Sequence, residues 1–103
     1  MSEPSRIRAQ QQGATTLVRV RVAHEMESGQ RRDAAGKPIP AWHVSEFQVA
    51  LNGRPVLSGQ WGTAVSKNPF VQFSLRGAKA GDRITVSWVD NRGDRRSDDA
   101  LVV

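Results

Sequence analysis

Apolar and polar residues alternate along most of the chain. The alternation is clearest in residues 16–23, where three valines fall on one side and two arginines on the other. A period of two is typical of a strand that buries one face. Residues 42–51, 70–76 and 83–90 also show it, residues 6–10 show it weakly, and residues 55–60 and 95–103 follow turn signals, so we predict seven strands, at residues 6–10, 16–23, 42–51, 55–60, 70–76, 83–90 and 95–103. No stretch of ten or more residues has an apolar period of 3.6, and we predict no helix.

Turn signals separate these segments. Asn52-Gly53 lies between two of them, and this dipeptide is the strongest short-range indication of a β-hairpin. Residues 77–82 hold two glycines, and residues 91–94 hold an Asn and a Gly that can supply positive φ angles. Seven short strands in 103 residues predict a single domain, residues 1–103, folded as an all-β, immunoglobulin-like antiparallel sandwich. A small closed barrel is the alternative architecture.

The connection at residues 25–41 is the one long break in this rhythm. Connections of more than roughly 12–15 residues are uncommon in compact domains and are often functional. Turn signals at residues 28–29 and 33–36 predict that the segment doubles back on itself as a small hairpin. The alternative is a strand extension that covers a sheet edge.

No catalytic or metal-binding motif is evident in the sequence. The chain has no cysteine, which excludes disulfides, thiolate metal sites and thiol catalysis within it. The run from His24 to Glu27 is followed by Ser28, so it lacks the second histidine of a zinc-protease motif. His24 and Met26 alone are too few to hold a soft metal. We therefore predict no catalytic residues, no metal and no cofactor, and interpret His24 as a structural or solvent-exposed strand-end histidine.

The charge of the chain is basic and rests mainly on arginine. There are 15 basic and 10 acidic residues, a net charge of +5, and no run of five or six like charges that would indicate a nucleic-acid tail. Arg6 and Arg8 share one strand face, and Arg19 and Arg21 share another. If those strands paired with all four arginines on one side, like charges would repel unless an acidic partner covered them. A solvated face and a contact for an acidic protein surface are the two interpretations.

The aromatic residues fall into two groups. Phe47, Phe73 and Trp88 are in phase with aliphatic neighbours and are predicted to lie in the core. Trp42 and Trp61 lie at strand ends, where they either close the core or act as interface hot spots. No aromatic is predicted to accompany the paired arginines, as a nucleic-acid-binding sheet would require.

Four longer runs closely resemble the SoxZ family, and the resemblance covers nearly the whole chain from Arg6 onward. They are HEMESGQRRDAAGKPIPAW at residues 24–42, NGRPV at 52–56, QWGTAVSKNPF at 60–70 and WVDNRGD at 88–94. The resemblance implies an immunoglobulin-type sandwich that is the non-catalytic partner of SoxY. In that family's complex, SoxY carries sulfur intermediates of thiosulfate oxidation covalently on a cysteine near the end of a flexible arm.

The resemblance also implies partners and a location. SoxY is expected to form a heterodimer with the chain, with transient contacts to a c-type cytochrome that loads thiosulfate, a hydrolase that releases sulfate and a sulfane dehydrogenase. No nucleic acid or membrane is expected as a partner, and the isolated chain is expected to be able to self-associate as a homodimer through the same surface. No apolar signal stretch follows Met1, so the resemblance implies a periplasmic protein exported together with SoxY.

Partner-binding residues are predicted among aromatics outside the core and the long connection. The set is Trp42, Trp61, Val65, Phe70, Met26, Arg31 and Arg32. An alternative function is a small basic β-domain that binds nucleic acid or another polyanion, which the pI of about 11.1 favours and the lack of paired aromatics opposes.

Overall fold

The computed structural model describes residues 2–103, which form seven β-strands and no helix. The strands are β1 (Arg6–Gln12), β2 (Thr15–Arg21), β3 (Val44–Leu51), β4 (Arg54–Gln60), β5 (Phe70–Arg76), β6 (Arg83–Asp90) and β7 (Arg95–Leu101). All seven predicted strands are confirmed. The second strand ends and the third begins two residues away from the prediction, because the chain leaves the sheets there to form the long connection. The first strand is two residues longer than predicted and the last is two residues shorter. No helix in this part of the chain could therefore cross a membrane.

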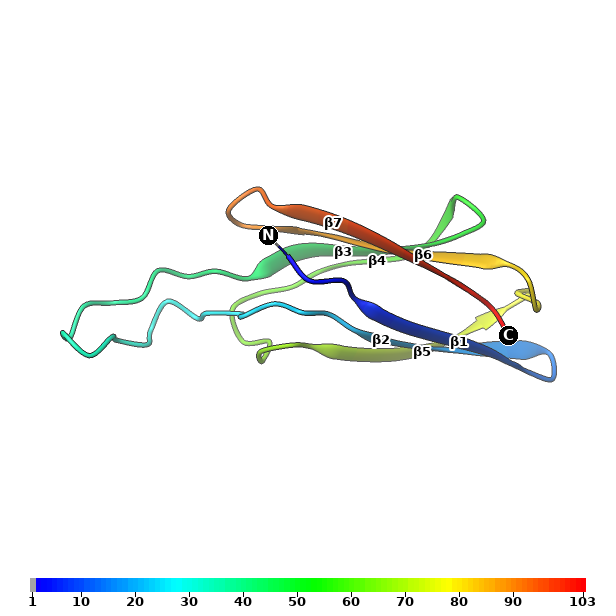
Figure 1. Cartoon of the computed structure of the whole chain (residues 1–103), viewed down its shortest axis with the longest axis horizontal. Helices are drawn as coiled ribbons and strands as arrows, with labels where there is room; N and C mark the ends of the chain where they lie inside the picture. The colour runs from blue at the N-terminus through cyan, green and yellow to red at the C-terminus, as the bar shows by residue number, and fades with distance from the viewer. Residues whose placement is uncertain (1) are drawn as a thin grey trace.

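The strands form two antiparallel sheets that lie face to face (Figure 1). One sheet has three strands in the order β1-β2-β5, and the other has four in the order β4-β3-β6-β7. This is the predicted immunoglobulin-like sandwich, and the closed-barrel alternative is wrong because the two sheets remain separate. Asn52 and Gly53 adopt φ angles of 50° and 83°, which closes the β3–β4 hairpin as that dipeptide indicates.

The core lies between the inward faces of the two sheets. Side chains with no solvent exposure come from both sheets, among them Val18 and Val20 on β2, and Val49 and Ile84 on β3 and β6. The predicted core residues Phe47 and Trp88 are each 3% exposed. Phe73 is only half-buried, because β5 is the edge strand of its sheet and the ring lacks a neighbour on one side.

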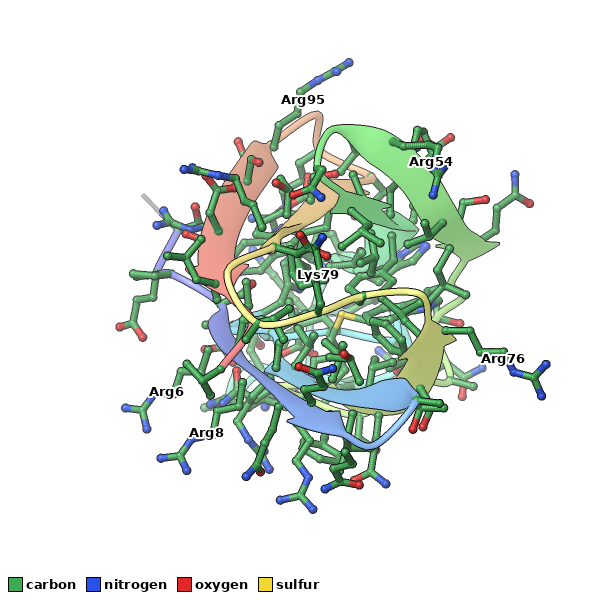
Figure 2. All side chains as sticks on the ribbon, turned by 90° about the vertical axis from the view of Figure 1, so that its right-hand side faces the viewer. Arg6, Arg8, Arg54, Arg76, Lys79 and Arg95 are labelled. Atoms are coloured by element: carbon green, nitrogen blue, oxygen red, sulfur yellow. The ribbon has the colours of Figure 1, made fainter. Side chains whose placement is uncertain are left out.

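The two long edges of the sandwich differ. At the β1 and β7 edge, Gln11 N–H donates to the Val103 carbonyl at 2.8 Å and Val103 N–H donates to the Ala9 carbonyl at 2.9 Å. At the other edge, no backbone hydrogen bond among the described residues joins β4 to β5. Viewed from the end, β1 and β7 lie close together and β4 and β5 lie apart (Figure 2). The partly buried apolar residues on β4, β5 and the segment between them are here called the open flank: Val56, Trp61, Val65, Val71, Phe73 and Leu75.

Residues 25–41, here called the arm, project beyond the end of the sandwich (Figure 1). The molecule measures 53 Å along its longest axis and 21 and 20 Å across. Glu27 and Trp42 exchange backbone hydrogen bonds of 2.6 and 2.9 Å, and Ile39 N–H donates to the Arg31 carbonyl at 2.8 Å. The prediction of a small hairpin is confirmed, and the alternative of an extension that covers a sheet edge is wrong.

Candidate partner-binding site

A buried carboxylate organises the base of the arm. Asp90, the last residue of β6, is 3% exposed, and its Oδ2 accepts hydrogen bonds from His24 Nε2 at 3.1 Å and Trp42 Nε1 at 2.8 Å. Its Oδ1 accepts from the backbone N–H groups of Arg92 and Asp94, both at 2.9 Å. Burial raises the pKa of the Asp90 carboxyl, but the bonds from His24, Trp42, Asp94 and Arg92 together hold it below its usual value. Asp90 is therefore a carboxylate at neutral pH.

The hydrogen bonds define the tautomer of His24. Met26 N–H donates to His24 Nδ1 at 3.1 Å, so Nδ1 is the acceptor and Nε2 carries the proton that is donated to Asp90. The ring is packed 4.8 Å from that of Trp42 and edge-on to Trp88 at 5.2 Å. His24 is 6% exposed, which confirms its interpretation as a structural histidine and shows that the solvent-exposed variant is wrong.

This cluster fixes the arm to the four-stranded sheet. His24 lies where the chain enters the arm, Trp42 where it returns, and Asp90 binds both side chains from β6. The Arg92 guanidinium lies over the Trp42 ring, 4.2 Å from its centroid, and adds a cation–π contact. Because every oxygen of Asp90 and both nitrogens of His24 already have partners, the pair serves to position the arm and has no free atom to act as a base.

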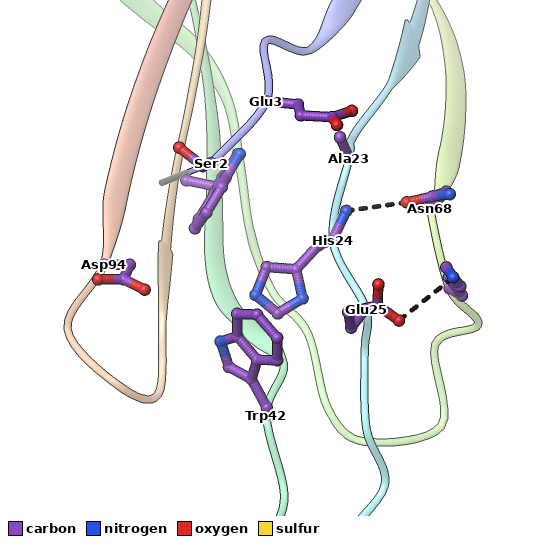
Figure 3. A pocket seen from close by; sticks show the side chains of 10 residues that line it. Ser2, Glu3, Ala23, His24, Glu25, Trp42, Asn68 and Asp94 are labelled. Atoms are coloured by element: carbon purple, nitrogen blue, oxygen red, sulfur yellow. Dashed lines mark hydrogen bonds and ion pairs between the residues drawn. The ribbon is translucent and has the colours of Figure 1, made fainter.

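A shallow pocket of about 380 Å³ lies beside the cluster (Figure 3). His24, Trp42 and Trp88 form one side, and a 3.3 Å ion pair between Lys67 and Glu25 lies at another. No group of three histidine or acidic side chains in residues 2–103 is arranged to hold a metal. None of the described side chains that line the pocket is a nucleophile hydrogen-bonded to a base.

The predicted partner-binding residues do not form one patch. Trp42 is half-buried at the base of the arm, while Arg31 and Arg32 are exposed on it. Arg31 forms an ion pair with Glu27, and Arg32 Nη1 donates to the Gly36 carbonyl at 2.8 Å, so both side chains also brace the hairpin. Trp61 and Val65 lie on the open flank, and Phe70 lies at the start of β5.

Met26 requires a correction. It is 7% exposed in the free chain, and its Sδ accepts a hydrogen bond from Val44 N–H at 3.3 Å. Its backbone adopts a φ of 54°, a conformation that is uncommon for residues other than Gly, Asn and Asp. With this backbone conformation the side chain is buried at the base of the arm. Met26 is therefore a core residue at the arm's base, and no partner reaches it in this conformation.

Trp61 connects the open flank to the core. Its ring stacks on that of Phe47, with the centroids 4.8 Å apart and the planes at 14°. Phe47 belongs to the core, so Trp61 extends the core outward to a half-exposed surface. Leu57, on the edge strand β4, is 37% exposed and enlarges the apolar area. An apolar surface that continues the core is typical of a protein interface.

The pairing of β1 with β2 creates a second surface, which the sequence predicts only if these strands pair with their arginines on one side. In the β1–β2 pair, Arg6 lies opposite Arg21 and Arg8 opposite Arg19, so all four lie on one face, here called the arginine face. The prediction that no aromatic accompanies them is wrong. In the β2–β5 pair Phe70 lies opposite Arg21, whose guanidinium is 5.4 Å from the ring centroid.

A β-sandwich with a projecting arm and an open apolar flank has the features of a binding module. Comparison with protein families matches residues 6–100 to the family described as Sulphur oxidation protein SoxZ. The chain belongs to the SoxZ family, and its role lies in sulfur oxidation. No curated protein matches it.

Proposed function

We propose that the chain is the non-catalytic subunit that pairs with SoxY to form the carrier of covalently bound sulfur intermediates during thiosulfate oxidation. Membership of the SoxZ family supports this role. The chain has no cysteine, so it has no thiolate with which to hold sulfur, and the reactive thiol must belong to its partner.

The observation that carries the pairing is the open flank. Its apolar side chains are only partly covered, and the edges of β4 and β5 beside it have no strand partner among residues 2–103. Unpaired strand edges and uncovered apolar surface are liabilities in a free protein, which a permanent partner removes. Pro55 and Arg54 protect the start of β4, whereas β5 contains no proline, so β5 is the more accessible edge. SoxY covers the open flank in this proposal.

The arm gives the complex a second point of contact. Its two segments are joined to each other by isolated β-bridges and to Asp90 through Trp42, and residues 30–38 are exposed along their whole length. An arm that is already ordered loses little conformational entropy when it binds. Arg31, Arg32 and Trp42 remain predicted contacts, either to SoxY or to the cytochrome, hydrolase and dehydrogenase that act in turn. The complex is proposed to work in the periplasm, which the chain reaches together with SoxY.

Co-expression with a SoxY protein from the same organism tests the pairing, with a tag on SoxY alone. The expected result is a stable heterodimer on size exclusion, and failure to recover the chain with tagged SoxY contradicts the proposal. Sulfur-compound turnover by the isolated chain would also contradict its non-catalytic role.

Single substitutions locate the interface. Val65→Arg places a charge on the open flank, and Leu57→Arg places one beside it on β4. Both are expected to weaken the complex at least tenfold, because an unpaired charge would be desolvated there. Leu101→Arg is the matched control, since Leu101 is 56% exposed on β7 at the closed edge. A heterodimer that survives both flank variants refutes the flank as the interface and leaves the pairing itself intact. Self-association of the isolated chain is expected to respond to the same two variants.

A further inference from the structure

The net charge of the chain is concentrated on one sheet. The strands β1, β2 and β5 carry five arginines and no acidic residue. The rest of the chain carries ten basic and ten acidic residues, so the whole excess of +5 belongs to the three-stranded sheet. In the end view, Arg6 and Arg8 project outward from this sheet, away from the core (Figure 2).

The arginines are held in a regular array. The two cross-strand pairs place Cα atoms about 5 Å apart, and successive outward positions along a strand are about 7 Å apart. Like charges directly opposite each other destabilise a sheet. Among residues 2–103, Arg6, Arg8, Arg19 and Arg21 form no ion pair with a carboxylate, and only Arg21 has a side-chain hydrogen bond, to the Asn68 carbonyl at 3.4 Å.

The chemistry of the face favours carboxylates on a protein. Guanidinium groups bind carboxylates through two parallel hydrogen bonds, and acidic side chains at alternate positions of an extended segment match the spacing along β1 and β2. Phe70 is 52% exposed, and Leu17 lies on the same face between Gln10 and Ser74. These two apolar side chains suit a mixed protein surface. A single-strand nucleic-acid platform would instead need a series of aromatic rings.

We propose that the arginine face is a docking surface for an acidic, extended protein segment, whose carboxylates bind Arg6, Arg8, Arg19 and Arg21 and whose apolar side chains contact Phe70. This surface lies on the outside of the three-stranded sheet, whereas the open flank lies along the β4 and β5 edges. The proposal goes beyond the pairing with SoxY and does not require it, and one molecule has room for both contacts.

A labelled octaglutamate peptide tests the proposal on the full chain by fluorescence anisotropy at low ionic strength. Binding to the unmodified chain is expected, and the double variant Arg8→Gln, Arg19→Gln is expected to weaken it about tenfold or more. The matched control is Arg54→Gln, Arg95→Gln, which removes two exposed, unpaired arginines from the four-stranded sheet (Figure 2). The control is expected to bind within about twofold of the unmodified chain. Thermal unfolding shows that both variants remain folded.

Three outcomes overturn the proposal. The first is no measurable binding of the peptide by the unmodified chain. The second is an equal loss in both double variants, which would mean that net charge alone attracts the peptide. The third is tighter binding of an oligothymidylate of equal charge that is lost in Arg8→Gln, Arg19→Gln, which would assign the face to nucleic acid. None of these outcomes depends on SoxY, so the experiment separates this surface from the pairing at the open flank.

Discussion

The two sheets of the sandwich differ in the balance of their basic and acidic residues. The four-stranded sheet carries four arginines and four acidic residues, and Arg83 and Arg96 form ion pairs with Asp99 and Asp98. The three-stranded sheet carries five arginines without one carboxylate. The charges of the first sheet sum to zero, and two of its four arginines form ion pairs with carboxylates, whereas the charge of the second sheet is balanced by no residue of that sheet.

The comparison teaches where stability and binding reside. A substitution that removes a matched charge from the four-stranded sheet leaves its partner without a bond, and the fold loses stability. A substitution at Arg6, Arg8 or Arg19 removes repulsion and breaks no ion pair among residues 2–103. The two sheets therefore predict opposite signs for the same type of change.

The largest effect is expected at Asp90. Asp90→Ala removes the acceptor of four hydrogen bonds and leaves the buried groups of His24 and Trp42 without a partner, so the free energy of unfolding should fall by about 3 kcal/mol. Asp99→Ala on the same sheet, which breaks an exposed ion pair, should cost at most about 0.5 kcal/mol. Urea unfolding measures both. A loss no greater for Asp90→Ala than for Asp99→Ala would show that the cluster does not hold the fold.

A smaller effect is expected from acid. Although burial raises the pKa of Asp90, its hydrogen bonds hold the folded value below that of an unfolded aspartate, about 3.9. The stability that this carboxylate contributes is therefore fully present above about pH 4 and is lost as the pH falls through the lower folded pKa. Asp90→Asn should show a flatter dependence of unfolding free energy on pH below about 4. Parallel curves for the two proteins would contradict the assignment.

The smallest effect, and the sharpest in sign, is expected from charge reversal on each sheet. Arg8→Glu creates a cross-strand pair with Arg19 and should stabilise the free chain by about 0.5 kcal/mol. Arg83→Glu sets two negative charges against each other at Asp99 and should destabilise it by a similar amount. Differential scanning calorimetry at low salt measures both, and about 1 M salt should reduce both shifts. A change in stability of the same sign for both variants would contradict the proposed difference between the two sheets.

Local signals were enough to predict most of the architecture. Alternation located five of the seven strands, because one face of each is buried or partly buried, and the turn signals before them located β4 and β7. The Asn52-Gly53 hairpin and the doubling back of the arm depend on residues close in sequence. The arginine face could also be predicted conditionally. If β1 pairs with β2 in this register, the side chains of Arg6, Arg8, Arg19 and Arg21 lie on the same face of the sheet.

The residues that define the sites required the tertiary structure. Asp90 was predicted only as the last residue of a strand, but its partners His24 and Trp42 lie 66 and 48 positions away. Met26 looked exposed within a polar segment, and only its positive φ and the approach of Val44 show that it is buried. Phe70 meets Arg21 because of the β2–β5 register, which no local pattern encodes. Sequence alone determined which residues form strands and turns, because those depend on neighbours along the chain. Which side chains come into contact was decided only by the tertiary structure, because these contacts join segments that are distant in the sequence and come together when the sheets pack.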